Sequence, residues 1–443
     1  MHFSIEEATI ARIHAAYRMG HLTARELVEG YLERIETYDK QGPSINSIVN
    51  ISAQARERAD ELDKYLTRTG RLSGRLHGIP VAVKDCIETA DMPTTFGSVA
   101  FKDYVPDEDA TVVTRLKDAG AIILAKTTLP DFATSWWSCS SVSGETRNPY
   151  ALDYDSGGSS SGSGAAVAAN FVTAALGADC GGSVRLPASH CCLVGVRTTP
   201  GLVSLKGVSP FVHLQDTVGP MTKTVRDAAE MLDALVGCDP NPTRAACGVA
   251  GASESYAASL SPGGLRGARI GLLTDALGSG EDDLCSAVND VVMSAVGAIR
   301  QAGAQVIEVE IPELAQRIAD TSLDVTCFRG ELDAFLADRP RAPVRTLEEI
   351  HESRQYHPLL DLLEMYAAGP EKPEDDPDYP RRLAARDVFS QALANLLGVH
   401  QLDALVFPDV QVPPPSREMI NARRWTSLTF PTTCSSPSVR PRV

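Results

Sequence analysis

The chain is predicted to be an α/β protein, because short apolar runs alternate with stretches of helical periodicity. Apolar runs at residues 79–83, 121–125 and 268–273 have the length of buried strands. Helical patterns begin at Thr111 and extend over Ala165–Ala175. This alternation is typical of βαβ units, in which a helix connects two parallel strands.

Composition and charge fit a large globular chain that does not bind nucleic acid. The 443 residues are 43% hydrophobic and 22% charged, which is ordinary globular usage. The 41 Lys and Arg residues against 57 Asp and Glu residues give a net charge of −16. Because nucleic acids and anionic membranes bind cationic faces, neither is an expected partner. The longest largely apolar run, Gly164–Ala178, is about 15 residues, whereas a membrane span needs about 20, so we predict a buried helix there.

Residues 1–70 are predicted to form an N-terminal helical layer. Ser4 with Glu7 and Thr23 with Glu26 have the spacing of two capping boxes. Gly20 is expected to end the first helix. The N-terminus is acidic and has no long apolar block, which favours neither a signal peptide nor a transit peptide and predicts a cytoplasmic protein.

The remainder is expected to complete a single domain over residues 1–431, with a central core at 71–237 and a second α/β portion at 268–431. Between these portions lies a Pro/Gly/Ala/Ser-rich connector at 238–267. In the second portion we predict a strand at 268–273, a helix over 284–299, strands at 306–311 and 404–408, and a surface loop at 369–380. The tail at 432–443 has no periodicity and is not expected to pack as an element.

The cysteines and histidines do not indicate a metal site. The ten cysteines form no C-x-x-C pair, and the adjacent pair Cys191–Cys192 is poorly placed for joint ligation or for an ordinary disulfide. The nine histidines are scattered along the chain. We therefore expect no metal.

A glycine- and serine-rich segment, SGGSSSGSG at 156–164, runs directly into a predicted helix. Three interpretations compete: a phosphate cradle, a structural close approach with helix capping, and a hydrolase site with hydroxyl groups and oxyanion-binding amides. No G-x-x-x-x-G-K-[ST] motif is present, which argues against the first interpretation.

A second glycine pair favours the hydrolase interpretation. In DCGGSVR at 179–185, two glycines let consecutive N–H groups point at one spot beside the Ser183 hydroxyl. No G-x-S-x-G elbow accompanies it, so a histidine base is not indicated. The candidate base is Lys84, at the end of an apolar strand, where burial would lower its pKa and make the neutral amine a base.

These motifs closely resemble the amidase signature family of serine hydrolases. The family pattern opens with G-G-S-S-[GS]-G and closes with D-x-G-G-S-[IV]-R-x-P, which here read GGSSSG at 157–162 and DCGGSVRLP at 179–187. The spacing also matches, with 183 − 159 = 24 between the serines and 159 − 84 = 75 back to the lysine. The resemblance covers residues 1 to about 431 and implies a three-layer α/β/α fold with a central mixed β-sheet.

The resemblance implies a Ser183–Ser159–Lys84 triad. Ser183 would form an acyl-enzyme, and Ser159, beside an expected cis peptide bond, would relay its proton with neutral Lys84 at the other end. The N–H groups of Cys180, Gly181, Gly182 and Ser183 would form the oxyanion hole. No metal or organic cofactor would be needed.

Supporting roles follow from the same resemblance. Ser160 would bond to or orient Lys84, and Asp179 and Arg185 would brace the nucleophile loop. The arginine has two interpretations, a structural ion pair and a contact with an acidic substrate. Ala133 matches a position of the acyl pocket, and two of the three tryptophans, Trp136 and Trp137, lie close by. Aromatic side chains more often fill a core than bind a ligand; contact here would indicate an apolar or aryl substrate.

Two features depart from the family pattern. Cys192 stands where relatives have glycine, and Arg197 and Thr198 replace a lysine and a proline. The tail after Thr433 lacks the further segment of relatives, so a truncated or catalytically silent binding scaffold is the alternative to an amidase. The expected binding partner is a small-molecule amide, and a role as a glutamyl-tRNA amidotransferase subunit is less favoured. A homodimer is possible, since the sequence does not fix the oligomeric state.

Overall fold

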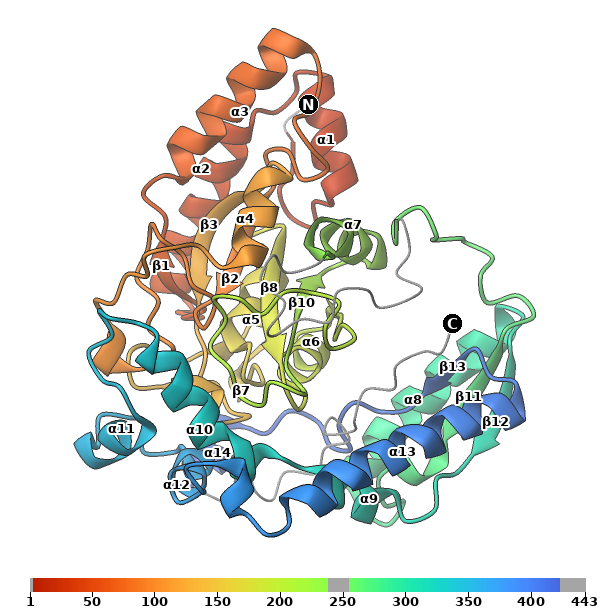
Figure 1. The fold of residues 1–443 in the computed structure, drawn as a ribbon. Helices are drawn as coiled ribbons and strands as arrows, with labels where there is room; N and C mark the ends of the chain where they lie inside the picture. Colours follow the sequence, from red (N-terminus) through yellow and green to blue (C-terminus); the bar gives the residue numbers. More distant parts are fainter. Residues whose placement is uncertain (1–2, 238–254, 423–443) are drawn as a thin grey trace.

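The computed structural model describes residues 3–237 and 255–422, and these build a central mixed sheet of six strands (Figure 1). The strand order is β1-β3-β2-β8-β10-β9, with β2 parallel to both β3 and β8 and the other pairings antiparallel. The predicted mixed sheet is therefore confirmed. Its strands are β1 (Ile48–Ile51), β2 (Pro80–Lys84), β3 (Ile122–Thr127), β8 (Ala174–Asp179), β9 (Val194–Gly195) and β10 (Thr217–Thr222).

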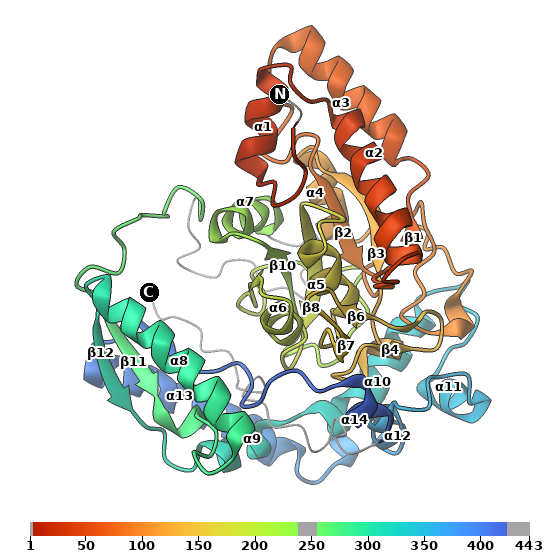
Figure 2. The same cartoon turned by 180° about the vertical axis from the view of Figure 1, so that it is seen from behind.

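The middle of this sheet is shielded on both faces. Every residue of β2 and β3 is buried, including Lys84 at the end of β2 and Lys126 in β3. Continuous apolar runs are typical of strands covered on both sides, and here helix α4 (Thr111–Asp118) covers one face and α5 (Ser161–Ala168) the other (Figures 1 and 2). The strands expected at 79–83 and 121–125 are confirmed to within two residues.

Three helices, α1 (Ile10–Arg18), α2 (Ala24–Arg34) and α3 (Ala55–Thr69), form the predicted N-terminal layer (Figure 1). The capping box of Thr23 is confirmed. The box expected at Ser4 is wrong: Thr9 caps the first helix, and Glu7 has φ +53° and lies outside it. The Glu7 N–H instead donates to Asn170 Oδ1 at 2.8 Å, so a side chain distant in the sequence satisfies this backbone donor.

The prediction of a single helix over the apolar run at 164–178 is wrong, because this run forms a helix followed by a strand. Helix α5 ends at Ala168, Asn170 adopts φ +57°, and β8 begins at Ala174. Alanine and valine fit either state when both faces are buried, so periodicity does not distinguish them. The pairing of β8 with β2 on one side and with β10 on the other decides the outcome for this segment.

A second sheet of three parallel strands, in the order β12-β11-β13, forms the other lobe (Figure 2). Its strands and helix α8 match the predicted segments closely, whereas α9 and α13 were not predicted. Part of the expected 369–380 loop is a short 3-10 turn, Pro373–Asp375. The elements are β11 (Arg269–Leu273), β12 (Gln305–Val309), β13 (Ala404–Val406), α8 (Asp283–Gln301), α9 (Leu314–Thr321) and α13 (Tyr379–His400).

Helices α10 (Asp324–Ala337), α11 (Leu347–Ser353) and α12 (Asp361–Ala367) lie below the six-stranded sheet in Figure 1 and share the main core. The short elements are β4 (Cys139–Ser140), β5 (Gly144–Glu145), β6 (Arg147–Asn148), β7 (Ala151–Asp155), α6 (Arg185–His190), α7 (Val225–Leu235) and α14 (Arg417–Asn421). The predictions for residues 238–254 and for the tail at 432–443 lie outside the described residues.

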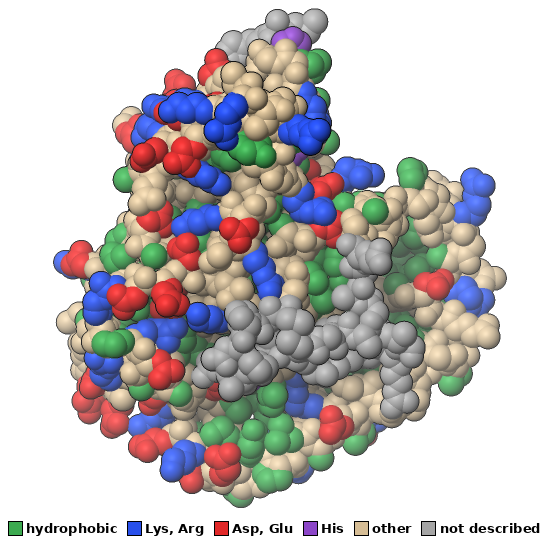
Figure 3. Space-filling model, turned by 45° about the horizontal axis from the view of Figure 1, so that its top comes forward, with side chains coloured by type: hydrophobic (Ala, Val, Ile, Leu, Met, Phe, Trp, Pro, Cys, Tyr) green, Lys and Arg blue, Asp and Glu red, His purple; other side chains and the backbone are tan. Residues whose placement is uncertain are grey.

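The surface mixes charges of both signs on the face drawn in Figure 3. No helix within residues 3–237 and 255–422 is both long and apolar enough to cross a membrane. In the same ranges, no three His, Cys, Asp or Glu side chains are grouped to hold a metal ion.

Candidate active site

Lys84 is buried at the carboxyl end of β2, where the chain leaves the sheet. Its Nζ lies 2.7 Å from Ser159 Oγ and donates to the Ala178 carbonyl oxygen at 3.1 Å. The side chain is almost wholly inaccessible, at 1% exposure. Burial lowers the pKa of Lys84, and the nearby Cys86, Asp179 and Asp216 side chains oppose that shift without cancelling it. A neutral amine is therefore favoured more here than for a lysine in water.

Ser159 follows a cis peptide bond from Gly158 and is completely buried. Its hydroxyl connects the lysine to the cavity that Ser183 also lines. Gly158 has no room for a side chain, since an added Cβ would lie 2.9 Å from the carbonyl carbon of Trp136. The expected cis bond beside Ser159 is thus present, and it follows the second glycine of the GGSSSG segment.

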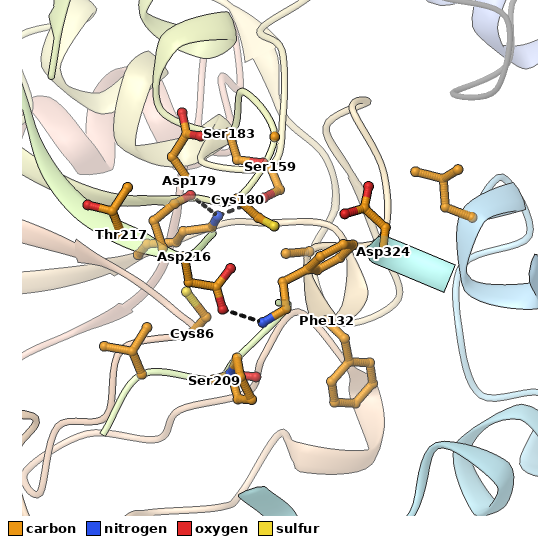
Figure 4. Close-up of a pocket in the computed structure, with 18 of the residues that line it drawn as sticks. Cys86, Phe132, Ser159, Asp179, Cys180, Ser183, Ser209, Asp216, Thr217 and Asp324 are labelled. Atoms are coloured by element: carbon orange, nitrogen blue, oxygen red, sulfur yellow. Dashed lines mark hydrogen bonds between the residues drawn. The ribbon is translucent and has the colours of Figure 1, made fainter. Parts of the chain in front are cut away.

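Ser183 lies on the turn between β8 and α6 and is half-buried. The Ser160 N–H donates to the Ser183 carbonyl oxygen at 3.0 Å, which ties the two serine loops together. Lys84, Ser159 and Ser183 all line one pocket, where Ser159 and Ser183 lie side by side (Figure 4). Side chains 24 and 99 residues apart in the chain (183 − 159 and 183 − 84) are therefore brought to one site.

Asp179 organises the loop that carries Ser183. Its carboxylate accepts from the N–H groups of Gly182 at 2.9 Å and Val184 at 3.0 Å, and it pairs with Arg185 at 3.1 Å and Arg197 at 2.6 Å. Burial would raise the pKa of Asp179, but the two guanidinium groups outweigh it and hold that pKa well below its usual range. Arg185 makes the structural ion pair, one of its two predicted roles.

The predicted amide cluster is divided between two tasks. The Gly182 N–H is used by Asp179 Oδ1, so in this conformation it is not directed at a substrate. Cys180, Gly181 and Ser183 line the pocket, while Gly182 does not. Gly182 therefore differs from its expected role, because a carboxylate three residues earlier satisfies its N–H.

Ser160 contacts Ala178, which binds Lys84, and not its expected partner Lys84 itself. Its Oγ contacts both the carbonyl oxygen and the N–H of Ala178 at 3.3 Å, and that same carbonyl accepts from Lys84. Gly177 leaves space for this contact, since an added Cβ would lie 2.7 Å from Ser160 Oγ. Ser160 thus contacts the backbone that binds the lysine.

Asp85, next to Lys84, makes contacts within the protein core. It forms a fully buried ion pair with Lys126 at 3.1 Å and accepts from Thr95 N–H at 3.0 Å. The Lys126 ammonium also donates to the Ile87 carbonyl oxygen and to Thr94 Oγ1, each at 2.7 Å. This network fixes the chain where it turns out of β2 just beyond Lys84.

The pocket has a volume of about 1000 Å³ including its open mouth. Ala133 and Trp136 line it, while Trp137 is buried in the core. Several lining residues were not foreseen from the sequence, because they come from segments outside the two glycine–serine motifs. The missed residues include Phe211, Asp216, Asp324, Leu362, Met365 and Tyr366.

The departures from the family pattern have local explanations. Cys192 adopts φ +54°, in the left-handed region that favours glycine. Arg197 is not a neutral replacement, because its Nη1 donates to the Asp179 carboxylate and to the Asp179 carbonyl oxygen, each at 2.6 Å. This positioning role was missed from the sequence, since nothing in the motif brings residue 197 next to residue 179.

Comparisons with known proteins agree with this geometry. The sequence model of the Amidase family matches residues 26–437. One subunit of the glutamyl-tRNA(Gln) amidotransferase from Prochlorococcus marinus (strain MIT 9303) is 38% identical over 311 residues, which are 70% of this chain and 62% of that protein. A probable amidase from Arabidopsis thaliana is 35% identical over 366 residues, 79% of this chain and 68% of that protein.

Among solved structures, the native peptide amidase from Stenotrophomonas maltophilia has a TM-score of 0.85 and 34% identity, covering 98% of this chain and 88% of that one. The corresponding amidotransferase subunit from Thermotoga maritima has a TM-score of 0.72 and 28% identity, covering 96% and 84%. The chain thus spans less than two thirds of the Prochlorococcus protein, and nearly all of it aligns with a solved amidase. By sequence and by fold, the chain belongs to the amidase signature family.

Proposed function

We propose that the protein is a serine amidohydrolase that cleaves a carboxylic amide to the acid and ammonia or an amine. The observation that carries the proposal is the 2.7 Å contact between buried Lys84 Nζ and Ser159 Oγ in a pocket that Ser183 lines. Relatives named peptide amidase and probable amidase support the same reaction class.

In the first half-reaction, Ser183 Oγ forms a bond to the amide carbonyl carbon. Its proton passes to Ser159 Oγ while the Ser159 proton moves to neutral Lys84 Nζ. The same relay then returns a proton to the leaving nitrogen as the carbon–nitrogen bond breaks. An acyl-enzyme remains on Ser183, and water attacks it through the same two groups to release the acid.

The developing oxyanion needs donors that are already in position. We assign this role to the N–H groups of Cys180, Gly181 and Ser183, because Asp179 engages the fourth amide of the predicted cluster, that of Gly182. Asp179 therefore shapes the loop instead of contacting the substrate. Ala133 and Trp136 contribute to the pocket wall on which the acyl group lies.

The test is intact-mass spectrometry of the 443-residue chain after treatment with a serine-reactive fluorophosphonate. One adduct is expected on the wild-type protein, none on Ser183→Ala, and much slower labelling on Lys84→Ala. Ser189→Ala is the matched control, because Ser189 is exposed on α6 six residues from Ser183 and should leave labelling unchanged.

Ammonia release from a set of primary amides is measured on the same four proteins. Labelling together with hydrolysis supports the amidohydrolase. A folded chain that neither reacts at Ser183 nor hydrolyses any amide would instead support the binding scaffold, which is the alternative function drawn from the sequence.

A further inference from the structure

Outside its reactive end, the pocket is lined by both apolar and acidic side chains. One wall is apolar, and the rings of Phe211 and Tyr366 meet there edge to face at 5.2 Å beside Leu362 and Met365. Asp216 and Asp324 also line the pocket, and they lie apart from each other in Figure 4. Because apolar and acidic side chains line a single space, a ligand with an apolar body and one polar group fits it better than a wholly apolar ligand.

Most charged groups of the pocket already have partners. Asp179 is neutralised by two arginines, and Asp216 accepts from the N–H groups of Phe211 at 2.8 Å and Val212 at 3.2 Å. The carboxylate of Asp216 therefore fixes the loop that carries the aromatic wall. Lys84 is engaged with Ser159.

Asp324 differs from these groups because one of its oxygens has no partner among the described residues. It is the first residue of α10, and its Oδ1 accepts from Gln215 Nε2 at 3.3 Å. No residue in the described parts of the chain bonds to its Oδ2 or forms an ion pair with it. The nearby Arg386 donates to Gln215 Oε1 at 2.6 Å and to the Thr321 carbonyl oxygen at 3.2 Å instead.

Asp324 Oδ2 can accept a hydrogen bond from a ligand in the pocket. The N-terminal turn of a helix stabilises negative charge, whereas burial works against it and raises the pKa of this carboxyl. A cationic group on the substrate would offset that cost of burial and donate to the remaining acceptor. A carboxylate on the substrate would be repelled by the carboxylate of Asp324.

We propose that Asp324 selects substrates whose acyl part ends in an ammonium group, so that the preferred amides are ω-amino or amino-acid-like amides with an apolar middle. Asp324 binds the ammonium through Oδ2, while the aromatic wall packs against the methylene groups. This inference rests on the proposed amidohydrolase function, because it names the substrate class of the same pocket.

The experiment compares matched pairs of amides that differ only by ammonium against methyl, such as 6-aminohexanamide against heptanamide and 4-aminobutanamide against pentanamide. For the best pair, wild-type kcat/KM should favour the cationic amide by about tenfold or more. Asp324→Asn should lower that ratio by about tenfold, mainly through the KM of the cationic amide. The control is Asp320→Asn, whose exposed carboxylate pairs with Arg381 on the surface, and it should leave the ratio unchanged.

A binding measurement separates this inference from the amidase proposal. Titration calorimetry on Ser183→Ala, with and without Asp324→Asn, needs no turnover and should show the same preference for the cationic amide. A ratio near one in wild type, or a ratio that Asp324→Asn leaves unchanged in both assays, overturns the inference even if heptanamide is hydrolysed. Binding preference without any hydrolysis or Ser183 labelling would overturn the amidase proposal and leave a site for cationic amides.

Discussion

The two sheets of this protein bury their side chains to very different degrees. In the six-stranded sheet every residue of the inner strands β2 and β3 is buried. In the three-stranded sheet the inner strand β11 is buried from Ile270 to Leu273, whereas the edge strand β12 has only Val309 buried. Helix α8, beside the second sheet, buries only Cys285 and Val296 of its 19 residues and leaves Val291 70% exposed. The candidate triad lies entirely with the first sheet.

This contrast sets the environment of the candidate triad apart from that of the second lobe. A lysine becomes a base near neutral pH only where it is removed from water, and only the first sheet provides that environment at a strand end. The second lobe packs beside the site and helps place α10, but its own surfaces remain hydrated. Substitutions in the two lobes should therefore have unequal effects.

The largest effect is expected for Lys84→Ala. Loss of the proton acceptor should lower kcat/KM for amide hydrolysis by about 10³- to 10⁴-fold, with little change in the melting temperature. Arg269→Ala in β11 is the control in the second lobe and should change kcat/KM by less than about twofold. Comparable losses in the two variants would show that the site depends on overall integrity instead of on the lysine.

The next effect concerns stability, and Asp179→Asn tests it. Removing this buried charge leaves Arg185 and Arg197 without their carboxylate, so the free energy of unfolding should fall by about 3–5 kcal/mol in chemical denaturation at pH 7. Asp403→Asn, on an exposed residue that caps the Arg269 N–H at 2.8 Å, should cost less than about 1 kcal/mol.

The sign of the pH dependence follows from the lowered pKa of Asp179. Its stabilisation is complete above the ordinary Asp pKa of about 3.9 and is lost as the pH falls toward the lower folded-state value. The difference between wild type and Asp179→Asn should thus stay constant from pH 8 to 5. A difference that grows toward acid would contradict this assignment.

Packing in the two sheets is compared by truncating one side chain in each. Leu124→Ala in β3 removes a fully buried side chain and should cost about 3 kcal/mol. Val291→Ala in α8 removes a side chain that is 70% exposed and should change the free energy of unfolding by less than about 0.5 kcal/mol. Equal costs in urea denaturation would mean that α8 is covered in solution, and would remove the contrast.

The last prediction concerns the pH dependence of kcat/KM in the wild-type enzyme, which should change by at most about tenfold per pH unit. The neutral amine of Lys84 is the active form, so kcat/KM should rise with pH and level off above the pKa of the lysine. Because burial lowers that pKa, the plateau should begin below the ordinary lysine value of about 10.4. A profile that still rises tenfold per unit at pH 10 would indicate that Lys84 is not buried in the working enzyme.

Much of this architecture could be predicted from sequence because its signals are local. The Thr23 capping box, the buried strands around Val81 and Ile123 and the two glycine–serine motifs each occupy a few consecutive residues. The failures have a common cause. The false capping box at Ser4 and the single helix expected over 164–178 were decided by partners distant in the chain, namely Asn170 and the neighbouring strands.

For the site itself, the sequence alone predicted Ser183, Ser159 and Lys84 as the candidate triad, because the motifs that carry them and the spacing between them can be read from the chain. The tertiary structure decided what surrounds them. Arg197 reaches Asp179, Gly182 gives up its amide to that carboxylate, and Asp324 arrives from a helix 141 residues beyond Ser183 (324 − 183). Local sequence motifs reveal which side chains can react, because the motif residues are close in the chain. Burial, charge pairing and pocket shape arise only when distant segments pack against one another.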